Sequence, residues 1–177
     1  MGTEGLKNLP REMLIGVIED FAKNWLAHDG LWFQTVERAY GLEAAIEADT
    51  EAWRRFTVIE AKRIMARHGI EQGGGLEALK AALAFRHYAV INEQTISEET
   101  DRSFVFKMVD CRVQSARRRK NLPLFPCKSV GLVEYSGFAA TIDSRIRTDC
   151  IACPPDDTER DFYCGWRFSL DREPDQA

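Results

Sequence analysis

The chain has 177 residues, of which 45% are hydrophobic, and this size predicts a single domain with an ordinary core. Its net charge of −4 argues against nucleic acid as the main partner, because neutralised phosphates supply most of the affinity in such complexes. No apolar run reaches the roughly 18 residues of a membrane span, and the first residues lack the basic and apolar segments of a secretory signal. We therefore expect a cytoplasmic protein with no membrane partner.

Residues 9–87 are predicted to form a helical half. Apolar residues recur at helical spacing from Pro10 to Trp25, and the pattern stops at His28-Asp29-Gly30. We expect the first helix to end there, with Asp29 as the N-cap of a short second helix that Gly41 interrupts.

Two further helices follow in this half. The third is long, begins at Leu42 and ends at His68-Gly69, because glycine after the last periodic residue is a typical C-cap. The glycines Gly73-Gly74-Gly75 form a flexible break, and the fourth helix carries Leu76 and Leu83 on one face.

Residues 88–170, which contain all the cysteines, are predicted to form the sheet half. The expected elements are strands at 88–96, 103–110, 145–152 and 161–170, with one helix at 126–142 between the two pairs. The predicted fold class is α+β: an N-terminal helical half packed on a C-terminal antiparallel sheet of about four strands. Residues 1–177 then form one domain, with a frayed tail at 171–177.

Five cysteines carry the most concentrated chemistry of the chain. If the last two strands form a hairpin, Cys150 lies opposite Cys164 and Ile146 lies opposite Phe168, which keeps both apolar sets on one face. Cys150 and Cys153 have the Cys-x-x-Cys spacing at which two thiolates bind one soft ion. The candidate ligands of a zinc or iron site are Cys111, Cys150, Cys153 and Cys164. The alternative is that Cys150 and Cys164 are small hydrophobic residues on a buried face.

Three further residues are candidates for catalysis. Cys127 opens a predicted helix, where the macrodipole lowers a thiol pKa. Glu60 lies on the apolar stripe of the third helix, as does Asp49, and Glu37 shares a face with aromatic residues of the second. Carboxylates that face a core often have raised pKa values, which suits general acid or base catalysis. The alternative is a carboxylate at the edge of the surface or in an internal salt bridge.

Polar and aromatic residues suggest how a ligand is held. His28 and Trp32 flank the predicted end of the first helix, although capping also explains the histidine. Arg112 begins a basic run that is either a solvated face or a loop that binds carboxylate or phosphate groups. Trp166 is among the aromatic residues expected to supply apolar walls.

Several segments together resemble a known group of proteins. They are residues 25–32, Glu37, Trp53, Cys111-Arg112-Val113-Gln114, Cys127-Lys128, Cys150 to Pro155 and Tyr163-Cys164. The chain, from about Leu9 to Leu170, resembles a poorly characterised family of bacterial and archaeal cytosolic proteins. That family is similar to the L-2-amino-thiazoline-4-carboxylate hydrolase-like group and, more distantly, to four-vinyl-reductase-type small-molecule-binding domains. The resemblance implies a helices-plus-sheet architecture that binds ligands. It implies that the five cysteines are the first site residues and that His28, Trp32 and Glu37 come next.

The predicted function is that of a small-molecule-binding domain with a cysteine-lined, metal-bearing pocket. One alternative is a hydrolase that opens a C–N bond of a small cyclic or carboxylated substrate, with metal-activated water or a cysteine thiolate as nucleophile. A second alternative is a non-catalytic interaction domain that forms a homodimer.

Overall fold

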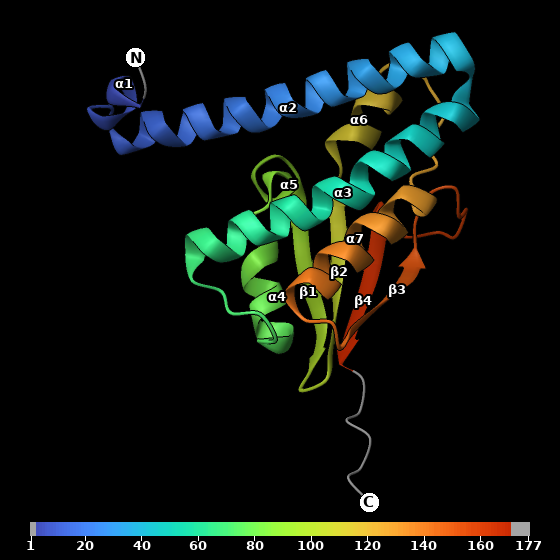
Figure 1. Ribbon diagram of the computed structural model, residues 1–177. Coiled ribbons are helices and arrows are strands. Elements are labelled where there is room, and N and C mark those ends of the chain that lie inside the picture. The colour runs from blue at the N-terminus through green and yellow to red at the C-terminus, as the bar shows by residue number, and fades with distance from the viewer. Residues whose placement is uncertain (1–2, 171–177) are drawn as a thin grey trace, which may run out of the picture.

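A computed structural model describes residues 3–170 of the chain (Figure 1). It confirms the α+β class: a helical N-terminal half is followed by a four-stranded antiparallel sheet. The helices are α1 (Glu4–Lys7), α2 (Arg11–Tyr40), α3 (Leu42–His68), α4 (Gly75–Leu83), α5 (His87–Ile91), α6 (Arg112–Arg119) and α7 (Lys128–Ile142). The strands are β1 (Glu93–Thr100), β2 (Ser103–Asp110), β3 (Ile146–Ala152) and β4 (Cys164–Leu170). The predicted frayed tail, 171–177, lies outside the described residues. None of the described helices combines the length and the apolar character that crossing a bilayer requires.

The sheet has the strand order β1-β2-β4-β3 and buries one face under the helices (Figure 1). Phe106 and Trp166, from β2 and β4, lie on that face and pack against Tyr135 of α7, with ring centroids 5.8 Å and 4.8 Å away. Trp166 also lies so close to Gly131 that a Cβ there would be 2.7 Å from its ring. Because α7 packs directly on the sheet, residues on its inner face are buried in the core.

Helix α3 is the second layer and packs across α7. The Thr57 hydroxyl donates a 2.9 Å hydrogen bond to the backbone carbonyl of Glu134. A Cβ on Gly137 would lie 2.8 Å from the Thr57 methyl, so the two helices are in close contact there. The predicted C-cap is confirmed, because Gly69 has the left-handed conformation with φ of 65°.

Helix α2 differs from its prediction, because it runs unbroken through His28-Asp29-Gly30 to Tyr40. Asp29 is therefore inside the helix and is not an N-cap. A glycine inside a helix costs only about 1 kcal/mol relative to alanine, and packing of α2 against α3 and α5 offsets that cost. The break comes at Gly41, whose φ of 90° turns the chain into α3.

The hairpin register also differs from its prediction. Cys150 pairs with Trp166 and Ile146 pairs with Leu170, two residues away from the expected partners. A shift of two residues keeps each side chain on the same face of the sheet, so the predicted inner face is correct. The alternation in residues 161–170 also assigns Phe162 to the inner face, but Phe162 precedes the strand and packs on Gly165, whose place in the strand alternation is on the other face.

Two segments have a different secondary structure from the one expected. Residues 88–91 continue α5, and the first strand begins at Glu93 and runs to Thr100, through part of the 97–101 segment whose sequence favours a turn. The basic run from Arg112 to Arg119 is a helix, α6, and not a loop.

Candidate ligand-binding site

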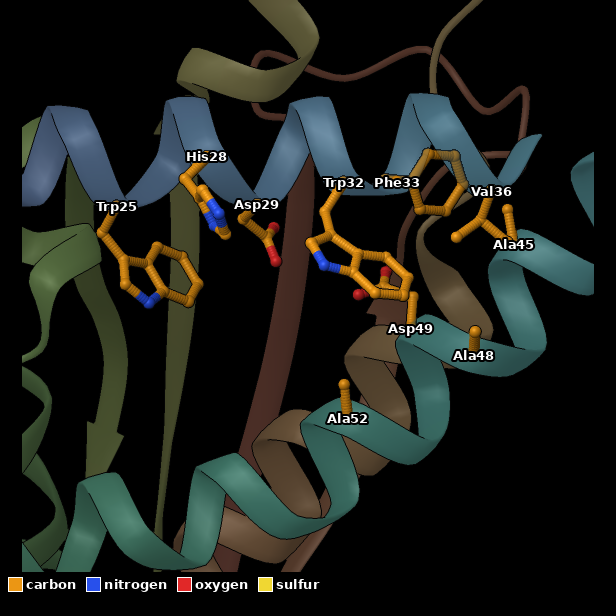
Figure 2. A pocket seen from close by; sticks show the side chains of 10 residues that line it. All are labelled: Trp25, His28, Asp29, Trp32, Phe33, Val36, Ala45, Ala48, Asp49 and Ala52. Atoms are coloured by element: carbon orange, nitrogen blue, oxygen red, sulfur yellow. The ribbon is translucent and has the colours of Figure 1, made fainter. Parts of the chain in front are cut away.

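A cavity of about 320 Å³ lies between α2 and α3 (Figure 2). Residues of α2 spaced three or four apart form one wall, and small residues of α3 with the same spacing form the other. The lining residues are Trp25, His28, Asp29, Trp32, Phe33 and Val36 of α2, and Ala45, Ala48, Asp49 and Ala52 of α3. The three alanines of α3 leave room that larger side chains would fill. The cavity therefore depends on the small residues of α3 as well as on the large residues of α2 that face them.

Two carboxylates, Asp29 and Asp49, point into this space from opposite helices (Figure 2). Burial raises the pKa of Asp29, while the charges of His87 and His28 act in the opposite direction. Burial and the negative charges of Asp29 and Glu134 raise the pKa of Asp49 to about 7, against a hydrogen bond from the Trp53 side chain. Asp49 is therefore partly protonated at neutral pH, which makes it suitable for proton transfer or for recognition of a cation.

A buried group of charges lies beside the cavity. The Nη2 atom of Arg86 lies 2.8 Å from Glu60 and 2.7 Å from Glu134. The Arg86 Nε–H donates a 2.9 Å hydrogen bond to Glu60 Oε2, and His87 Nδ1 lies 2.9 Å from Glu60 Oε1. One guanidinium is thus shared between two carboxylates, and Glu60 has His87 as a further partner.

The two glutamates respond differently to this shared partner. Burial by itself would raise the pKa of Glu60, but the charge of Arg86 and the contact with His87 lower it to about 2. Burial raises the pKa of Glu134 to about 7, although Arg86 opposes the change. Glu60 is therefore the carboxylate that Arg86 keeps ionised.

His87 connects the charge group to the cavity. Its ring centroid lies 4.1 Å from that of Trp25, which lines the cavity, and 4.1 Å from that of Tyr88. Its Nδ1 faces Glu60, and its Nε2 is buried and has no hydrogen-bond partner within residues 3–170. A polar atom in that state is unfavourable unless a ligand or water supplies a partner.

The cysteines gather near the end of the sheet but do not line the cavity. The sulfur atoms of Cys127 and Cys153 are 3.5 Å apart, and Cys164 is close enough to help raise the pKa of Cys153. Over the described part of the chain, no three His, Cys, Asp or Glu side chains are grouped so that they could hold a metal ion. This arrangement gives no support to the four-cysteine site predicted at Cys111, Cys150, Cys153 and Cys164, and zinc or iron remains a prediction from the sequence.

Phe125 and Gln114 connect the cavity wall to Cys127. The ring of Phe125 packs edge-on against Phe33 of the cavity wall, with centroids 4.9 Å apart. The Gln114 side chain donates to the Phe125 carbonyl and accepts from the Phe125 N–H, both at 2.9 Å. The same amide nitrogen lies 3.5 Å from the Cys127 sulfur, so the two regions are neighbours.

The structure places the predicted site residues in different regions. His28 and Trp32 line the cavity, and Glu60 belongs to the charge group beside it. Glu37 lies in the last turn of α2 and does not line the cavity.

The other two predicted ligand-binding residues lie elsewhere. The Arg112 side chain is exposed at the start of α6, while its backbone N–H donates to Asn92. Trp166 is fully buried between the sheet and α7. Neither residue is part of the cavity lining.

Residues that sequence reasoning missed are Arg86, His87 and Glu134. Glu134 is a carboxylate inside a mostly apolar helix, and this is the same signal that drew attention to Glu60. Arg86 is the N-cap of the short helix α5 and His87 is its first residue, and neither carries a comparable pattern.

Comparison with known proteins gives a family and no activity. No curated protein and no solved structure matches the chain. The model of DUF6125, described as a family of unknown function, matches residues 7–170. Since that match spans nearly the whole chain, the protein belongs to the DUF6125 family.

Proposed function

We propose that the protein binds a small organic cation in the cavity between α2 and α3. The observation that carries this proposal is the pair of carboxylates, Asp29 and Asp49, set among the aromatic rings of Trp25, Trp32 and Phe33. A carboxylate attracts a cation through charge, and an aromatic face attracts it through the ring quadrupole. The volume lies at the lower end of the range for small-molecule sites, roughly 300–1,000 Å³.

The charge balance around the cavity also favours a cation. Within residues 3–170, neither Asp29 nor Asp49 forms an ion pair with a lysine or arginine. The nearby Arg86 is already shared between Glu60 and Glu134. A bound cation would add positive charge beside Asp49 and would hold it in its ionised form.

Benzamidinium is a suitable probe because it combines an aromatic ring with a delocalised positive charge. We expect it to bind the full chain, as measured by calorimetry and by shifts of tryptophan indole signals in NMR spectra. The Asp29→Asn and Trp32→Ala variants should each weaken its binding about tenfold, because each loses a contact of about 1.4 kcal/mol. Binding should also weaken as the pH falls below about 7, where Asp49 takes up a proton.

Controls separate cation recognition from simple apolar binding. Benzamide has nearly the same shape without the charge and should bind at least tenfold more weakly. Glu47→Gln changes an exposed carboxylate of α3 outside the lining and should leave the affinity unchanged. Equal binding of benzamide and benzamidinium, or no effect of Asp29→Asn, would contradict the proposal.

A hydrolase is the second candidate, and the pKa of about 7 at Asp49 favours it. A group that titrates near neutral pH can both accept and donate a proton, as opening a C–N bond requires. The resemblance to the L-2-amino-thiazoline-4-carboxylate hydrolase-like group agrees with this candidate, because that name describes a small ring with an amino substituent. Incubation of such amino-substituted rings with the protein, followed by NMR detection of ring opening, tests it.

Homodimer formation is a separate proposal, and apolar residues of α2 support it. Met13, Ile18 and Phe21 are 54%, 55% and 64% exposed, and Figure 1 shows this end of α2 projecting past the helices beside it. We expect sedimentation velocity to give twice the mass of the chain. The double variant Ile18→Glu with Phe21→Glu should sediment as a monomer. A wild-type protein that stays monomeric at high micromolar concentration would exclude this dimer.

A further inference from the structure

Cys127 and Cys153 are in contact where the start of α7 meets the end of β3. Cys127 is the N-cap of α7, and Cys153 follows β3 directly. The Lys128 N–H donates to the Pro154 carbonyl at 3.0 Å, which joins the residues that follow each cysteine. The sulfur atoms are 3.5 Å apart, and a disulfide of about 2.05 Å would require them to approach by only about 1.5 Å.

An acidic residue strengthens this connection. Asp156 accepts from the Cys153 N–H at 3.1 Å and from the Lys128 ammonium at 2.9 Å and 3.0 Å. Lys128 is adjacent to Cys127, so this interaction ties the two cysteine-bearing segments together a second time. These hydrogen bonds hold together the two segments that carry the sulfur atoms.

The two thiols have different environments. Cys127 is partly exposed, and its sulfur faces both the Cys153 thiol and the Gln114 amide. These two contacts lower the pKa of Cys127, in spite of its burial. Cys153 is fully buried, and its contacts with Cys127 and Cys164 raise its pKa, so it keeps its proton.

We propose that Cys127 and Cys153 form a dithiol site that reacts with hydroperoxides, with Cys127 as the attacking thiol and Cys153 as the resolving thiol. The proposal rests on the contact between the two sulfur atoms and on the exposure of only one of them. It is independent of cation binding, because neither cysteine lines the cavity.

The chemistry balances in two steps. The Cys127 thiolate attacks one peroxide oxygen, the O–O bond breaks, and the other oxygen leaves as an alcohol or water after taking up a proton. Cys127 is then a sulfenic acid. The Cys153 sulfur attacks the Cys127 sulfur, the S–O bond breaks, and water leaves with the proton of Cys153. In total two thiols are oxidised to one disulfide, and one hydroperoxide is reduced to an alcohol and water.

The test is to treat the reduced full chain with one equivalent of hydrogen peroxide. We expect the intact mass to fall by two hydrogens, and peptide mapping to find the disulfide between Cys127 and Cys153. Alkylation of the reduced protein at pH 7 should modify Cys127 at least tenfold faster than Cys150, because the pKa of Cys127 is lowered while that of Cys150 is raised, and a protonated thiol is a weak nucleophile. A disulfide between any other pair, or equal alkylation rates, would overturn the proposal.

Variants separate the two roles. Cys127→Ser should abolish the reaction with peroxide, whereas Cys153→Ser should leave a sulfenic acid on Cys127 that dimedone traps. Cys150→Ser is the matched control and should form the same disulfide at the wild-type rate. If Cys153→Ser does not fold by circular dichroism, the peptide map of the wild-type protein still decides between the expected pair and any other. Wild-type-like oxidation of Cys127→Ser would contradict the assignment of the attacking thiol.

Discussion

Replacing Arg86 by methionine is expected to lower the free energy of unfolding by about 3–5 kcal/mol, the range measured when one partner of a buried ion pair is removed. The variant leaves Glu60 and Glu134 buried with no guanidinium between them. It also removes the cation that lies 4.6 Å from the Phe138 ring. Methionine fills a similar volume, so the loss measures charge more than packing. Urea denaturation followed by tryptophan fluorescence gives the value.

The pH dependence of the stability of the Arg86→Met variant shows whether the buried glutamate charges cause the loss. Without the guanidinium, the folded-state pKa values of both glutamates lie above their unfolded values, so the folded state binds more protons. The variant should therefore lose stability as the pH rises through the range from about 4.5 upward. Glu60→Gln and Glu134→Gln, added to Arg86→Met, should restore part of the loss.

A matched control comes from the same layer of helices. Arg63 is an exposed residue of α3, and Arg63→Met should change the stability by no more than about 0.5 kcal/mol. A loss of less than 1 kcal/mol in Arg86→Met would show that the buried pairs contribute little to folding.

Regular periodicity made much of the fold predictable. The stripe of apolar residues and the glycine after His68 predicted α3 almost to the residue, and the alternation of Phe104, Phe106 and Met108 predicted β2. These patterns report which face is buried, and burial decides the structure of long segments. The predictions were wrong where a local signal competed with packing. Gly30 suggested a helix end, but contacts with α3 and α5 keep α2 intact.

The candidate site was only partly predictable. His28 and Trp32, the ligand-binding candidates from the sequence, both line the cavity because α2 continues through them and sets them one turn apart, and their role in binding stays a prediction. The charge group was missed, because Arg86 meets Glu60 and Glu134 only after α3, α7 and the chain between α4 and α5 have packed together. Such contacts join residues far apart in sequence, and no local spacing encodes them.

Replacing Asp49 by asparagine is expected to raise the stability of the protein at pH 8 by about 1–2 kcal/mol. The pKa of Asp49 rises from its ordinary value of 3.8 to about 7 in the folded protein, mainly through burial. The folded state therefore binds a proton more tightly than the unfolded state does. Stability that is present below about pH 4 is lost as the pH rises toward 7. The full pKa shift of Asp49 would correspond to a gain in stability larger than about 1–2 kcal/mol, but partial contact with solvent screens the charge of the carboxylate.

Asparagine has the shape of the protonated carboxyl group and cannot ionise, so the variant should not show this loss. Thermal melts between pH 4 and pH 8 should give a flatter profile for Asp49→Asn than for the wild type. Some slope should remain, because the pKa of Glu134 is also raised to about 7 and acts in the same direction. Glu47→Gln on the exposed side of α3 should reproduce the wild-type profile.

The same variant should lose affinity for benzamidinium at pH 8 by at least tenfold, because half of the negative charge in the cavity is gone. A gain in stability together with a loss of binding is the signature of a carboxylate kept for a ligand and not for folding. If Asp49→Asn were instead less stable than the wild type at pH 8, Asp49 would have to be a structural residue. The cavity would then have only Asp29 to recognise a cation.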